Sequence, residues 1–356
     1  MNLLNYSLND LENLLLKMQE NKFHATQIFQ WIHQHYENNF NNMTNLPQKL
    51  RNKLIADFSI STPQLITEKI AQDGTIKWLL AVDDINKIET VFIPETNRYT
   101  LCISSQAGCA LNCHFCSTAQ QGFNRNLTVA EIIGQLFFAN QQLKSSGIKI
   151  TNVVMMGMGE PLTNYKSVVA AINIMLNDHG YGLSKRRVTI STSGISPRII
   201  DLAQQAPVSL AVSLHAAKDE VRTKIMPINN KYNIESLLTA CKYYIPYSPR
   251  KFITFEYVML DNINDRVEDA KSLANLINDI SCKINLIPFN PFPQTNFKCS
   301  DSKAIQQFKD TIVKLTGKVV TIRKTRGEDV DAACGQLAGS ILNKKKFQHN
   351  IIVQKA

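Results

Sequence analysis

The segment Cys109-Ala-Leu-Asn-Cys113-His-Phe-Cys116 places three cysteines within eight residues. It follows the apolar run Leu101–Ser104, which predicts a strand, so we expect the cysteines in the loop at the end of that strand. Three thiolates at this spacing can wrap one face of a metal centre. Because structural zinc sites take four protein ligands, three cysteines better suit a four-iron, four-sulfur cluster that keeps one iron open for a substrate.

From these residues alone, two other interpretations stay open. Cys102 or His114 would complete a four-ligand zinc site. Alternatively, the three cysteines are buried thiols that bind nothing, since free cysteine is among the residues most often buried. The chain on either side of the motif is needed to choose among them.

On the C-terminal side of the motif, strands and helices alternate from about residue 100 onward. This alternation implies a parallel sheet, either an open wound sheet or a full or partial barrel. In a barrel the functional groups lie at the carboxyl ends of the strands. The predicted strands cover residues 101–104, 152–156, 188–191, 208–214, 252–259, 284–288 and 319–322. The predicted helices cover roughly residues 129–146, 164–178, 196–205, 234–244, 266–280 and 302–316.

On the N-terminal side, the sequence predicts a small helical unit. Ser7 can cap a helix whose apolar residues follow helical spacing, and two more helices follow around Trp31 and Leu50. Two strand-like runs come next, Thr75–Val82 and Lys87–Pro94. We therefore expect a helical accessory domain for RNA binding at 1–70, a connecting β-hairpin at 71–98, an α/β core at 99–340 and a basic tail at 341–356.

The composition fits an enzyme of the cytoplasm. Hydrophobic residues make up 44% of the 356 residues and charged residues 19%, as in ordinary globular proteins. No run of about eighteen apolar residues predicts a membrane span, and the N-terminus lacks the pattern of a secretory signal. The 8 cysteines do not predict a disulfide framework in such a chain. The formal charge of +10 favours a polyanionic partner, although charge alone does not exclude a basic surface without one.

Polar residues follow several predicted strands and form a candidate cofactor pocket. The second strand ends in Met155-Met156-Gly157-Met158-Gly159-Glu160-Pro161, where glycines allow close backbone approach and the carboxylate can accept from an ammonium group. Taken alone, this segment is as well explained by a glycine-rich turn with an exposed glutamate. Further strands end at Ser191, at Ser213-Leu214-His215 and at Asn290, and each alone is typical of a turn or a cap. Together these groups would converge on one mouth of a barrel.

Cys102, Cys334 and Glu89 are further candidates. Cys334 lies among small residues after the last predicted strand, and Cys102 lies on the strand before the three-cysteine loop. The residues alone favour two buried thiols without a reaction. Glu89 has period-two spacing with Val91 and Ile93, so a strand would place its carboxylate on an apolar face. Such a carboxylate suits a general base, although an exposed glutamate on an edge strand fits the pattern as well.

Several segments resemble one known family. The CxxxCxxC spacing with Phe115 before the last cysteine resembles the radical S-adenosylmethionine superfamily, and its place after the first strand of an alternating α/β chain makes the likeness specific. More closely, nearly the whole chain is similar to the RlmN family of bacterial dual-specificity RNA (adenine-C2)-methyltransferases. The segments that carry this likeness are Ser117–Arg125, Leu183–Gly194, Lys324–Gly327 and Asp331–Leu337.

The resemblance implies a fold and two cofactors. The fold would be the partial (β/α)6-type TIM barrel of radical S-adenosylmethionine enzymes, with the small helical domain at its N-terminus. One [4Fe-4S] cluster per chain would be held by Cys109, Cys113 and Cys116. Its open iron would bind S-adenosylmethionine, of which two molecules are used per turnover. The implied contacts to S-adenosylmethionine are Gly159, Glu160, Ser191, Ser213, Leu214, His215 and Asn290.

The resemblance also implies roles for three residues in the methylation of adenine C2. Cys334 would carry the methyl group as S-methylcysteine, from which a 5′-deoxyadenosyl radical takes a hydrogen atom. Glu89 aligns with the proton acceptor of the family. Cys102 would assist proton removal and close a transient disulfide with Cys334 that releases 2-methyladenine. Transfer of the methyl group through Cys334 has a chemical reason, because adenine C2 is electrophilic and an electrophilic methyl sulfonium does not attack it directly.

The implied substrates are an adenine of 23S rRNA and the adenine 3′ to the anticodon of certain tRNAs. The basic charge and the cations Lys49, Arg51 and Lys53 fit a surface that tracks phosphates. We also expect a reductant such as flavodoxin and a monomeric chain. Two alternatives remain: the related Cfr family, which methylates C8 of the ribosomal adenine, and an RNA-binding protein with a structural iron–sulfur or zinc site.

Overall fold

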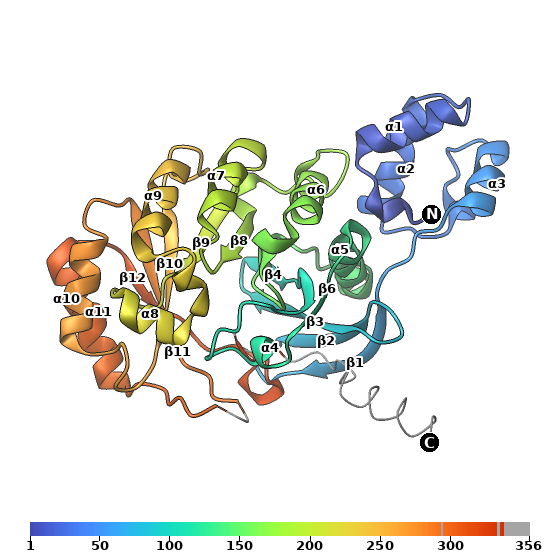
Figure 1. Ribbon diagram of the computed structural model, residues 1–356. Helices are drawn as coiled ribbons and strands as arrows, with labels where there is room; N and C mark the ends of the chain where they lie inside the picture. The colour runs from blue at the N-terminus through green and yellow to red at the C-terminus, as the bar shows by residue number, and fades with distance from the viewer. Residues whose placement is uncertain (293–294, 333–334, 338–356) are drawn as a thin grey trace, which may run out of the picture.

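The computed structural model describes residues 1–292, 295–332 and 335–337. Three N-terminal helices stand beside a large α/β unit, and Figure 1 shows them in blue. They are α1 (Leu8–Lys17), α2 (Phe23–His33) and α3 (Gln48–Asp57). Two predictions, the role of Cys334 and the basic tail at 341–356, concern residues outside the described part of the chain.

Helix α1 begins where the sequence predicts. The hydroxyl of Ser7 accepts a hydrogen bond from the backbone N of Asp10, and the Asp10 carboxylate accepts one from the backbone N of Ser7. This reciprocal pair satisfies two amide groups that the start of a helix leaves open. Leu11 and Leu15 follow at helical spacing and are buried, so the capped helix packs through one face.

Residues 64–70 correct one predicted boundary. The sequence predicts that they belong to the helical domain, but they form strand β1 (Gln64–Ile70), which pairs antiparallel with β2 (Ile76–Ala81). Every residue of β1 is exposed, so its sequence lacks the alternation of buried and exposed side chains that reveals a strand. Strand β2 in turn pairs antiparallel with β3 (Lys87–Glu95), close to the predicted runs at 75–82 and 87–94.

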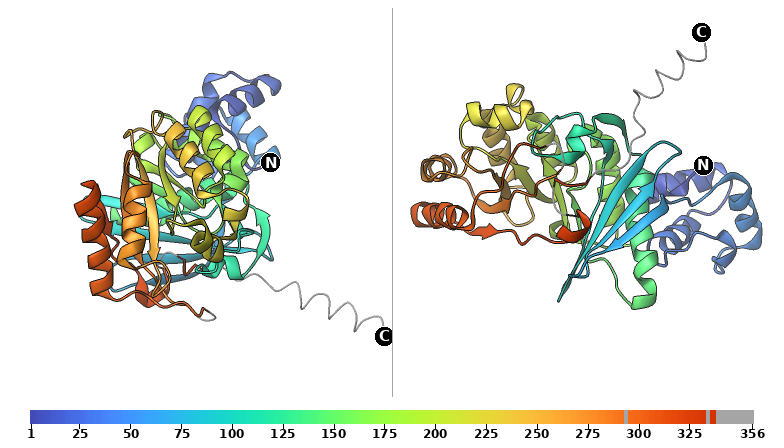
Figure 2. Two further views of the ribbon diagram at one scale, coloured as in Figure 1. Left: turned by 60° about the vertical axis from the view of Figure 1, so that its left-hand side comes forward. Right: turned by 90° about the horizontal axis from the view of Figure 1, so that it is seen from below.

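The core is a curved parallel sheet with helices on its outer face (Figures 1 and 2). From β3 the sheet continues in the order β4-β7-β8-β9-β10-β11-β12, and these strands are parallel to one another. The strands are β4 (Arg98–Cys102), β7 (Asn152–Met155), β8 (Val188–Thr192), β9 (Ser209–Ser213), β10 (Ile253–Met259), β11 (Cys282–Pro288) and β12 (Val320–Ile322). The helices that follow the first six are α5 (Val129–Leu143), α6 (Tyr165–Leu176), α7 (Ser196–Gln205), α9 (Ile234–Tyr244), α10 (Val267–Leu276) and α11 (Ser302–Thr316). These six strand–helix units form the predicted partial (β/α)6 barrel.

Four short elements at the strand ends escape prediction. Strands β5 (Gln106–Gly108) and β6 (Phe123–Asn126) pair antiparallel and enclose the three-cysteine loop together with helix α4 (Ser117–Gln120). Helix α8 (Asp219–Ile225) follows strand β9. Elements of three to seven residues are too short to show a period, so the sequence alone does not reveal them.

Strand register shows which side chains face the inside of the barrel. Lys77 on β2 lies opposite Val91 on β3, Val91 lies opposite Cys102 on β4, and Cys102 lies beside Val154 on β7. Residues that are paired in this way project from the same face of a sheet. Glu89 is two residues from Val91 and therefore shares that face. Lys77, Glu89 and Cys102 thus project into the barrel.

The same inner face continues to the end of the sheet. Val154 lies beside Thr189, so Ser191, two residues further along β8, also faces inward. Ser213 on β9 pairs with Glu256 on β10, and Glu256 pairs with Asn285 on β11. The inner face is therefore rich in polar groups near the carboxyl ends of the strands.

The outer face of the sheet is apolar and packs against the helices. Trp78 is fully buried, and its ring meets that of Phe138 on α5 edge-on, with 5.5 Å between the centroids. The hydroxyl of Thr90 donates to Oε1 of Gln135 on α5 at 2.8 Å, which fixes β3 against that helix. In the described part of the chain, no helix combines the length and the apolar character required to cross a lipid bilayer.

Candidate functional site

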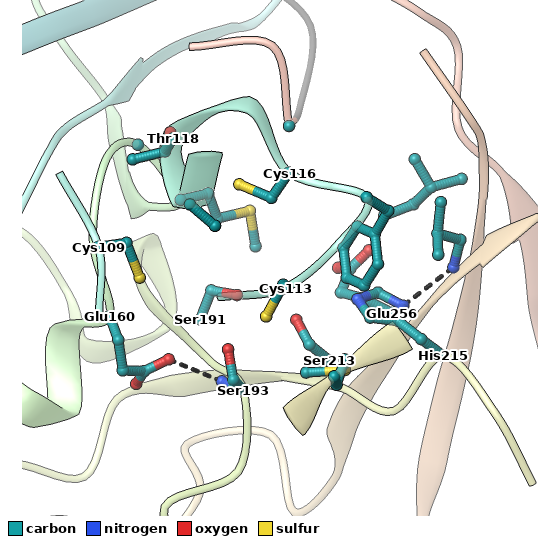
Figure 3. Close-up of a pocket in the computed structure, with 18 of the residues that line it drawn as sticks. Cys109, Cys113, Cys116, Thr118, Glu160, Ser191, Ser193, Ser213, His215 and Glu256 are labelled. Carbon is teal, nitrogen blue, oxygen red and sulfur yellow. Dashed lines mark hydrogen bonds between the residues drawn. The ribbon is translucent and has the colours of Figure 1, made fainter. Parts of the chain in front are cut away.

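A cavity opens at the carboxyl ends of the barrel strands. Its empty space is about 970 Å³, which includes a part that is open to solvent. Figure 3 shows that its walls combine thiols, carboxylates, hydroxyls and an imidazole from several strand ends. Of the residues predicted from the sequence, those that line it are Cys109, Cys113, Cys116, Gly159, Glu160, Ser191, Ser213, His215 and Asn290.

Backbone hydrogen bonds hold the three-cysteine loop in shape. The backbone N of Cys109 donates to the carbonyl O of Gly122 at 2.9 Å, and the backbone N of Cys116 donates to the carbonyl O of Cys113 at 3.2 Å. The three thiols project toward the same cavity in Figure 3. The loop therefore places the three thiols along the wall of one cavity.

The chemistry of these thiols fits an iron–sulfur cluster. Burial raises the pKa of the Cys109 thiol to about 12 and raises that of Cys113 well above its usual value. Such thiols keep their protons until a metal replaces them, because the ligand form of cysteine is the thiolate. Apolar side chains, Leu111 and Phe115 of the loop and Phe289, pack around Cys113. This shell would shield a cluster from water on that side.

The two residues considered as a fourth zinc ligand do not line the cavity. His114 is exposed, and Cys102 is buried on the sheet. Within the described ranges, no three His, Cys, Asp or Glu side chains are grouped as ligands of a single metal ion.

Glu160 is anchored by the neighbouring strand end. Its Oε2 accepts from the backbone N of Ser193 at 2.8 Å, and its Oε1 accepts from the hydroxyl of Thr192 at 2.8 Å and from the backbone N of Leu162 at 3.1 Å. Burial raises the pKa of Glu160, and these hydrogen bonds oppose that effect. The exposed-turn alternative is wrong, since Glu160 is 3% exposed.

Gly159 must be a glycine in this arrangement. Its φ of 95° lies in the left-handed region, and an added Cβ would approach the side chain of Gln106 to 2.4 Å. Gln106 cannot easily move, because its Oε1 accepts from the backbone N of Glu160 at 2.8 Å and its Nε2 donates to the hydroxyl of Thr163 at 2.7 Å. The glycine therefore lets β5 approach closely enough to hold Glu160.

His215 is buried and held as a neutral ring. Its Nδ1 accepts a hydrogen bond from the backbone N of Val258 at 3.0 Å (Figure 3), so the proton of the neutral ring is on Nε2. Burial lowers the pKa of His215 to about 3, and the charge of Arg222 adds to this effect. Phe115 of the three-cysteine loop meets the ring edge-on at 4.7 Å. His215 thus offers one N–H donor next to the cysteine loop.

Three predicted site residues, among those that the structure describes, do not line the cavity. Leu214 is fully buried, and its backbone N donates to the carbonyl O of Glu256 at 3.1 Å. Glu89 and Cys102 are each 7% exposed and project from the inner face of the sheet. The apolar surroundings predicted for Glu89 are wrong in one respect, because Lys77 lies 3.3 Å away. Cys334 is outside the described residues, but its neighbour Gly335 lines the cavity.

Sequence reasoning missed Arg222, whose side chain joins the ends of two neighbouring strands by hydrogen bonds. The guanidinium is fully buried on α8, and Nη2 donates to the carbonyl O atoms of Ser193 at 2.7 Å and Ser213 at 3.0 Å. Its Nε donates to the carbonyl O of Leu214 at 3.0 Å. Burial lowers the pKa of Arg222 to about 10. One arginine therefore joins the ends of β8 and β9, and no sequence period marks it.

Glu256 is a second cavity residue that the sequence did not reveal. It is 6% exposed, and its Oε2 accepts from Nδ2 of Asn285 at 2.8 Å. Burial raises the pKa of Glu256, whereas the charge of Arg323 opposes the increase. Glu256 lies in the middle of a predicted strand, and only the register of the barrel shows that it faces the cavity.

Comparisons with known proteins found matches for both the N-terminal helices and the α/β core. Residues 1–60 match the family described as ribosomal RNA large subunit methyltransferase N-terminal domain, and residues 103–274 match the radical SAM superfamily. The crystal structure of a radical SAM methyltransferase from Sphaerobacter thermophilus is 38% identical in sequence, with a TM-score of 0.90. The match covers 96% of this chain and 100% of that one. Streptococcus suis SuiB bound to S-adenosylmethionine is 12% identical, with a TM-score of 0.47, over 67% of this chain and 57% of that one.

These matches have a direct consequence for the cavity. Membership of the radical S-adenosylmethionine superfamily implies a [4Fe-4S] cluster and S-adenosylmethionine, and the cavity residues fit both. Within that superfamily, the N-terminal match and the 38% identity over 96% of this chain point to one family. The chain belongs to the RlmN-type family of radical S-adenosylmethionine methyltransferases that act on ribosomal RNA.

Proposed function

We propose that the chain methylates C2 of one adenine in 23S rRNA and of the adenine 3′ to the anticodon in tRNAs, with Cys334 as the methyl carrier. The observation that carries this proposal is the position of the residue after Cys334. Gly335 lines the cavity, and its carbonyl O accepts from the backbone N of Ser117 at 2.7 Å. Ser117 directly follows Cys116, so the residue after Cys334 is hydrogen-bonded to the residue that follows the three-cysteine loop.

The cofactors have defined places in this proposal. Cys109, Cys113 and Cys116 would hold one [4Fe-4S] cluster per chain, and Glu160 would accept from the amino group of S-adenosylmethionine. Gly159, Ser191, Ser213, Leu214, His215 and Asn290 are the remaining proposed contacts to the cofactor. When bound, the cluster and S-adenosylmethionine supply a 5′-deoxyadenosyl radical at the expense of one electron from an external reductant such as flavodoxin.

The chain's own residues perform the remaining steps. The Cys334 thiolate first takes a methyl group from one S-adenosylmethionine, with S-adenosylhomocysteine as the leaving group. In the next half of the cycle, the S-methyl group of Cys334 loses one hydrogen atom to the radical, and its carbon bonds to adenine C2. Glu89 would accept the C2 proton with assistance from Cys102, and the adduct would give up one electron to the oxidised cluster.

Release of the product depends on Cys102. Its thiolate attacks the sulfur of Cys334, a disulfide forms, and the bond between that sulfur and the methylene carbon breaks. The methylene group keeps the electron pair, takes a proton and becomes the methyl group of 2-methyladenine. An external thiol must reduce the disulfide before the next cycle, since forming it oxidises both cysteines.

The RNA would approach the open side of the cavity. A target base has to leave its stack to reach the strand ends, and the net charge of +10 favours contact with phosphates. Two of the three basic residues on α3 that were expected to contact phosphates form contacts within the helical domain instead. Arg51 donates to the carbonyl O of Asn41 at 2.7 Å, and Lys53 forms an ion pair with Glu20 at 2.6 Å. We expect a cytoplasmic protein, because such RNA substrates are in the cytoplasm, and the monomeric state stays a prediction.

Mass spectrometry of the product nucleoside tests this function. Reconstituted, reduced protein is incubated with S-adenosylmethionine and a 23S rRNA fragment, and the digested RNA is compared with 2-methyladenosine and 8-methyladenosine standards. The proposal predicts 2-methyladenosine and no product from a Cys113→Ala control. Formation of 8-methyladenosine would assign the chain to the Cfr reaction instead. Absence of any methylated adenosine from the loaded enzyme would support a protein that only binds RNA.

A further inference from the structure

The Lys77 ammonium joins two parts of the protein that are far apart in sequence. Its Nζ lies 3.3 Å from Oε1 of Glu89 and donates to the carbonyl O of Asp331 at 3.0 Å. Both side chains of the ion pair are buried, with 8% of Lys77 and 9% of Glu89 exposed. Asp331 precedes Cys334 by three residues. One cation therefore contacts the proposed base and the segment that leads to the proposed methyl carrier.

The sheet places Lys77 where such a contact is useful. Lys77, Val91 and Cys102 form one row across β2, β3 and β4 on the inner face of the barrel. Glu89 lies on the same face, toward the carboxyl end of β4, because β3 runs antiparallel to β4. The hydroxyl of Ser104, just beyond that end, donates to the carbonyl O of Glu89 at 2.7 Å. The backbone of Glu89 is thus fixed at the barrel mouth.

A fixed backbone does not by itself fix the carboxylate. A glutamate side chain has several rotatable bonds, and a general base must be held within hydrogen-bond reach of the proton that it removes. A buried lysine supplies a directional anchor, since its ammonium group prefers specific acceptors when water is excluded. Replacing a buried ion pair by apolar residues is often neutral for stability, so stability alone does not account for this pair.

We propose that Lys77 is a positioning residue that orients the Glu89 carboxylate toward the C2 proton of the adenine while the base is joined to the enzyme. This inference rests on the proposed function. It also gives a purpose to the contact between Lys77 and Asp331, because that contact keeps Glu89 and the segment that leads to Cys334 in one fixed relation. Loss of the Lys77 cation should therefore slow the removal of the C2 proton and leave the earlier steps intact.

A different contact to the same segment provides the matched comparison. Asp73, in the turn between β1 and β2, accepts from the backbone N of Gly327 at 3.3 Å and pairs with Arg326 at 3.6 Å. Asp73 therefore also holds the segment before Asp331 but belongs to a separate set of contacts from the Lys77–Glu89 pair. Asp73→Asn weakens the hold on the segment without removing the proposed anchor of the base.

Deuterium at adenine C2 gives a direct test. The full-length holoenzymes of wild type, Lys77→Met, Glu89→Gln and Asp73→Asn are compared on RNA with hydrogen or deuterium at that carbon. In Lys77→Met, we expect normal S-methylation of Cys334 and normal 5′-deoxyadenosine formation, but at least about tenfold less 2-methyladenine per 5′-deoxyadenosine. Deuteration should slow product formation several-fold in Lys77→Met and Glu89→Gln, with a much smaller effect in wild type and Asp73→Asn.

The double variant Lys77→Met/Glu89→Gln keeps the test decisive if an unpaired buried carboxylate prevents folding of Lys77→Met. The double variant should match Glu89→Gln alone, because the two residues act in one step. If a Lys77 variant that folds loses S-methylation of Cys334 or 5′-deoxyadenosine formation, the role of Lys77 is structural and the inference is overturned. It is also overturned if Lys77→Met shows no isotope effect while Glu89→Gln does. Absence of 2-methyladenine from wild type would refute the proposed function itself.

Discussion

The Glu160 carboxylate accepts a hydrogen bond from the backbone N of Ser193 at 2.8 Å, and this bond links the loops after β7 and β8. The two loops face the three thiols across the cavity (Figure 3). Glu160 is nearly fully buried and cannot gain hydrogen bonds from bulk water. Its charge is therefore directed to the cavity and to the donors that surround it.

Replacing this carboxylate should weaken cofactor binding. Glu160→Ala removes the acceptor proposed for the amino group of S-adenosylmethionine, a charge-assisted hydrogen bond of about 1.5–3 kcal/mol, which corresponds to roughly a 10- to 100-fold loss of affinity. Equilibrium dialysis with labelled S-adenosylmethionine and reconstituted protein measures this change. Glu160→Gln, which keeps the shape and loses the charge, should fall between wild type and alanine. Unchanged affinity in both variants would exclude this role.

Removing the buried guanidinium should destabilise the strand ends. Arg222→Met leaves the carbonyl groups of Ser193, Ser213 and Leu214 without this donor, and we expect the free energy of unfolding to fall by about 3 kcal/mol. Denaturant titration of the variant measures the loss. Arg198→Met is the control, because the Arg198 side chain is half-exposed and its ion pair with Asp201 should contribute little. Equal losses in the two variants would contradict the structural role given to Arg222.

His33 should make the protein sensitive to acid. Its ring lies between Phe29 and Tyr181, and burial lowers its pKa to about 3. Both ring nitrogens are buried and have no hydrogen-bond partner among the described residues. The pKa is below that of an unfolded histidine, so the unfolded chain binds more protons between these values and stability falls as the pH decreases through about 6.5. The contribution of His33 to the free energy of unfolding is fully present near neutral pH and is reduced by about 2 kcal/mol near pH 5.

Denaturant titrations at the two pH values test this assignment. In His33→Leu, the difference in unfolding free energy between neutral and acidic pH should shrink by that amount. His215, whose pKa is also lowered to about 3, remains in the variant and should keep part of the pH dependence. An identical pH dependence in wild type and His33→Leu would show that His33 is not buried as a neutral ring.

Without Cys102, the proposed covalent intermediate should persist. Cys102→Ala removes the thiolate that we propose breaks the bond between the Cys334 sulfur and the methylene carbon. We expect the RNA to remain attached to the protein, with a shifted band on a denaturing gel and a cross-linked peptide that contains Cys334. Cys241→Ala, which removes another buried cysteine away from the cavity, should show no attachment. Free 2-methyladenine from Cys102→Ala at the wild-type rate would contradict the role of Cys102.

The sequence predicted the parts of this site that depend on local order. The spacing of Cys109, Cys113 and Cys116 fixes three thiols on one loop, and the Gly159-Glu160 pair ends a strand whose period is readable. Repeated alternation of strand and helix then implies that these ends meet at one mouth. All of these features follow from neighbours in the chain.

Residues whose role depends on distant partners were missed. Arg222 lies on a seven-residue helix, and its partners Ser193 and Ser213 come from two other strand ends. In the sequence, Lys77 looks like an ordinary exposed lysine of a strand. Only the structure shows that it pairs with Glu89 and donates to the carbonyl O of Asp331. Strand β1 was missed for another reason, because an exposed edge strand buries no side chains in alternation.

The fate of the cofactor's methyl hydrogens tests the central claim most directly. With S-adenosylmethionine whose methyl group is fully deuterated, the Cys334 route transfers one deuterium to 5′-deoxyadenosine and leaves two deuterium atoms in the methyl group of 2-methyladenine. Mass spectrometry of both products reads this partition in a single reaction. Unlabelled 5′-deoxyadenosine together with a fully deuterated methyl group on the RNA would show that the methyl group reaches adenine by direct transfer, in contradiction to the account given for this chain.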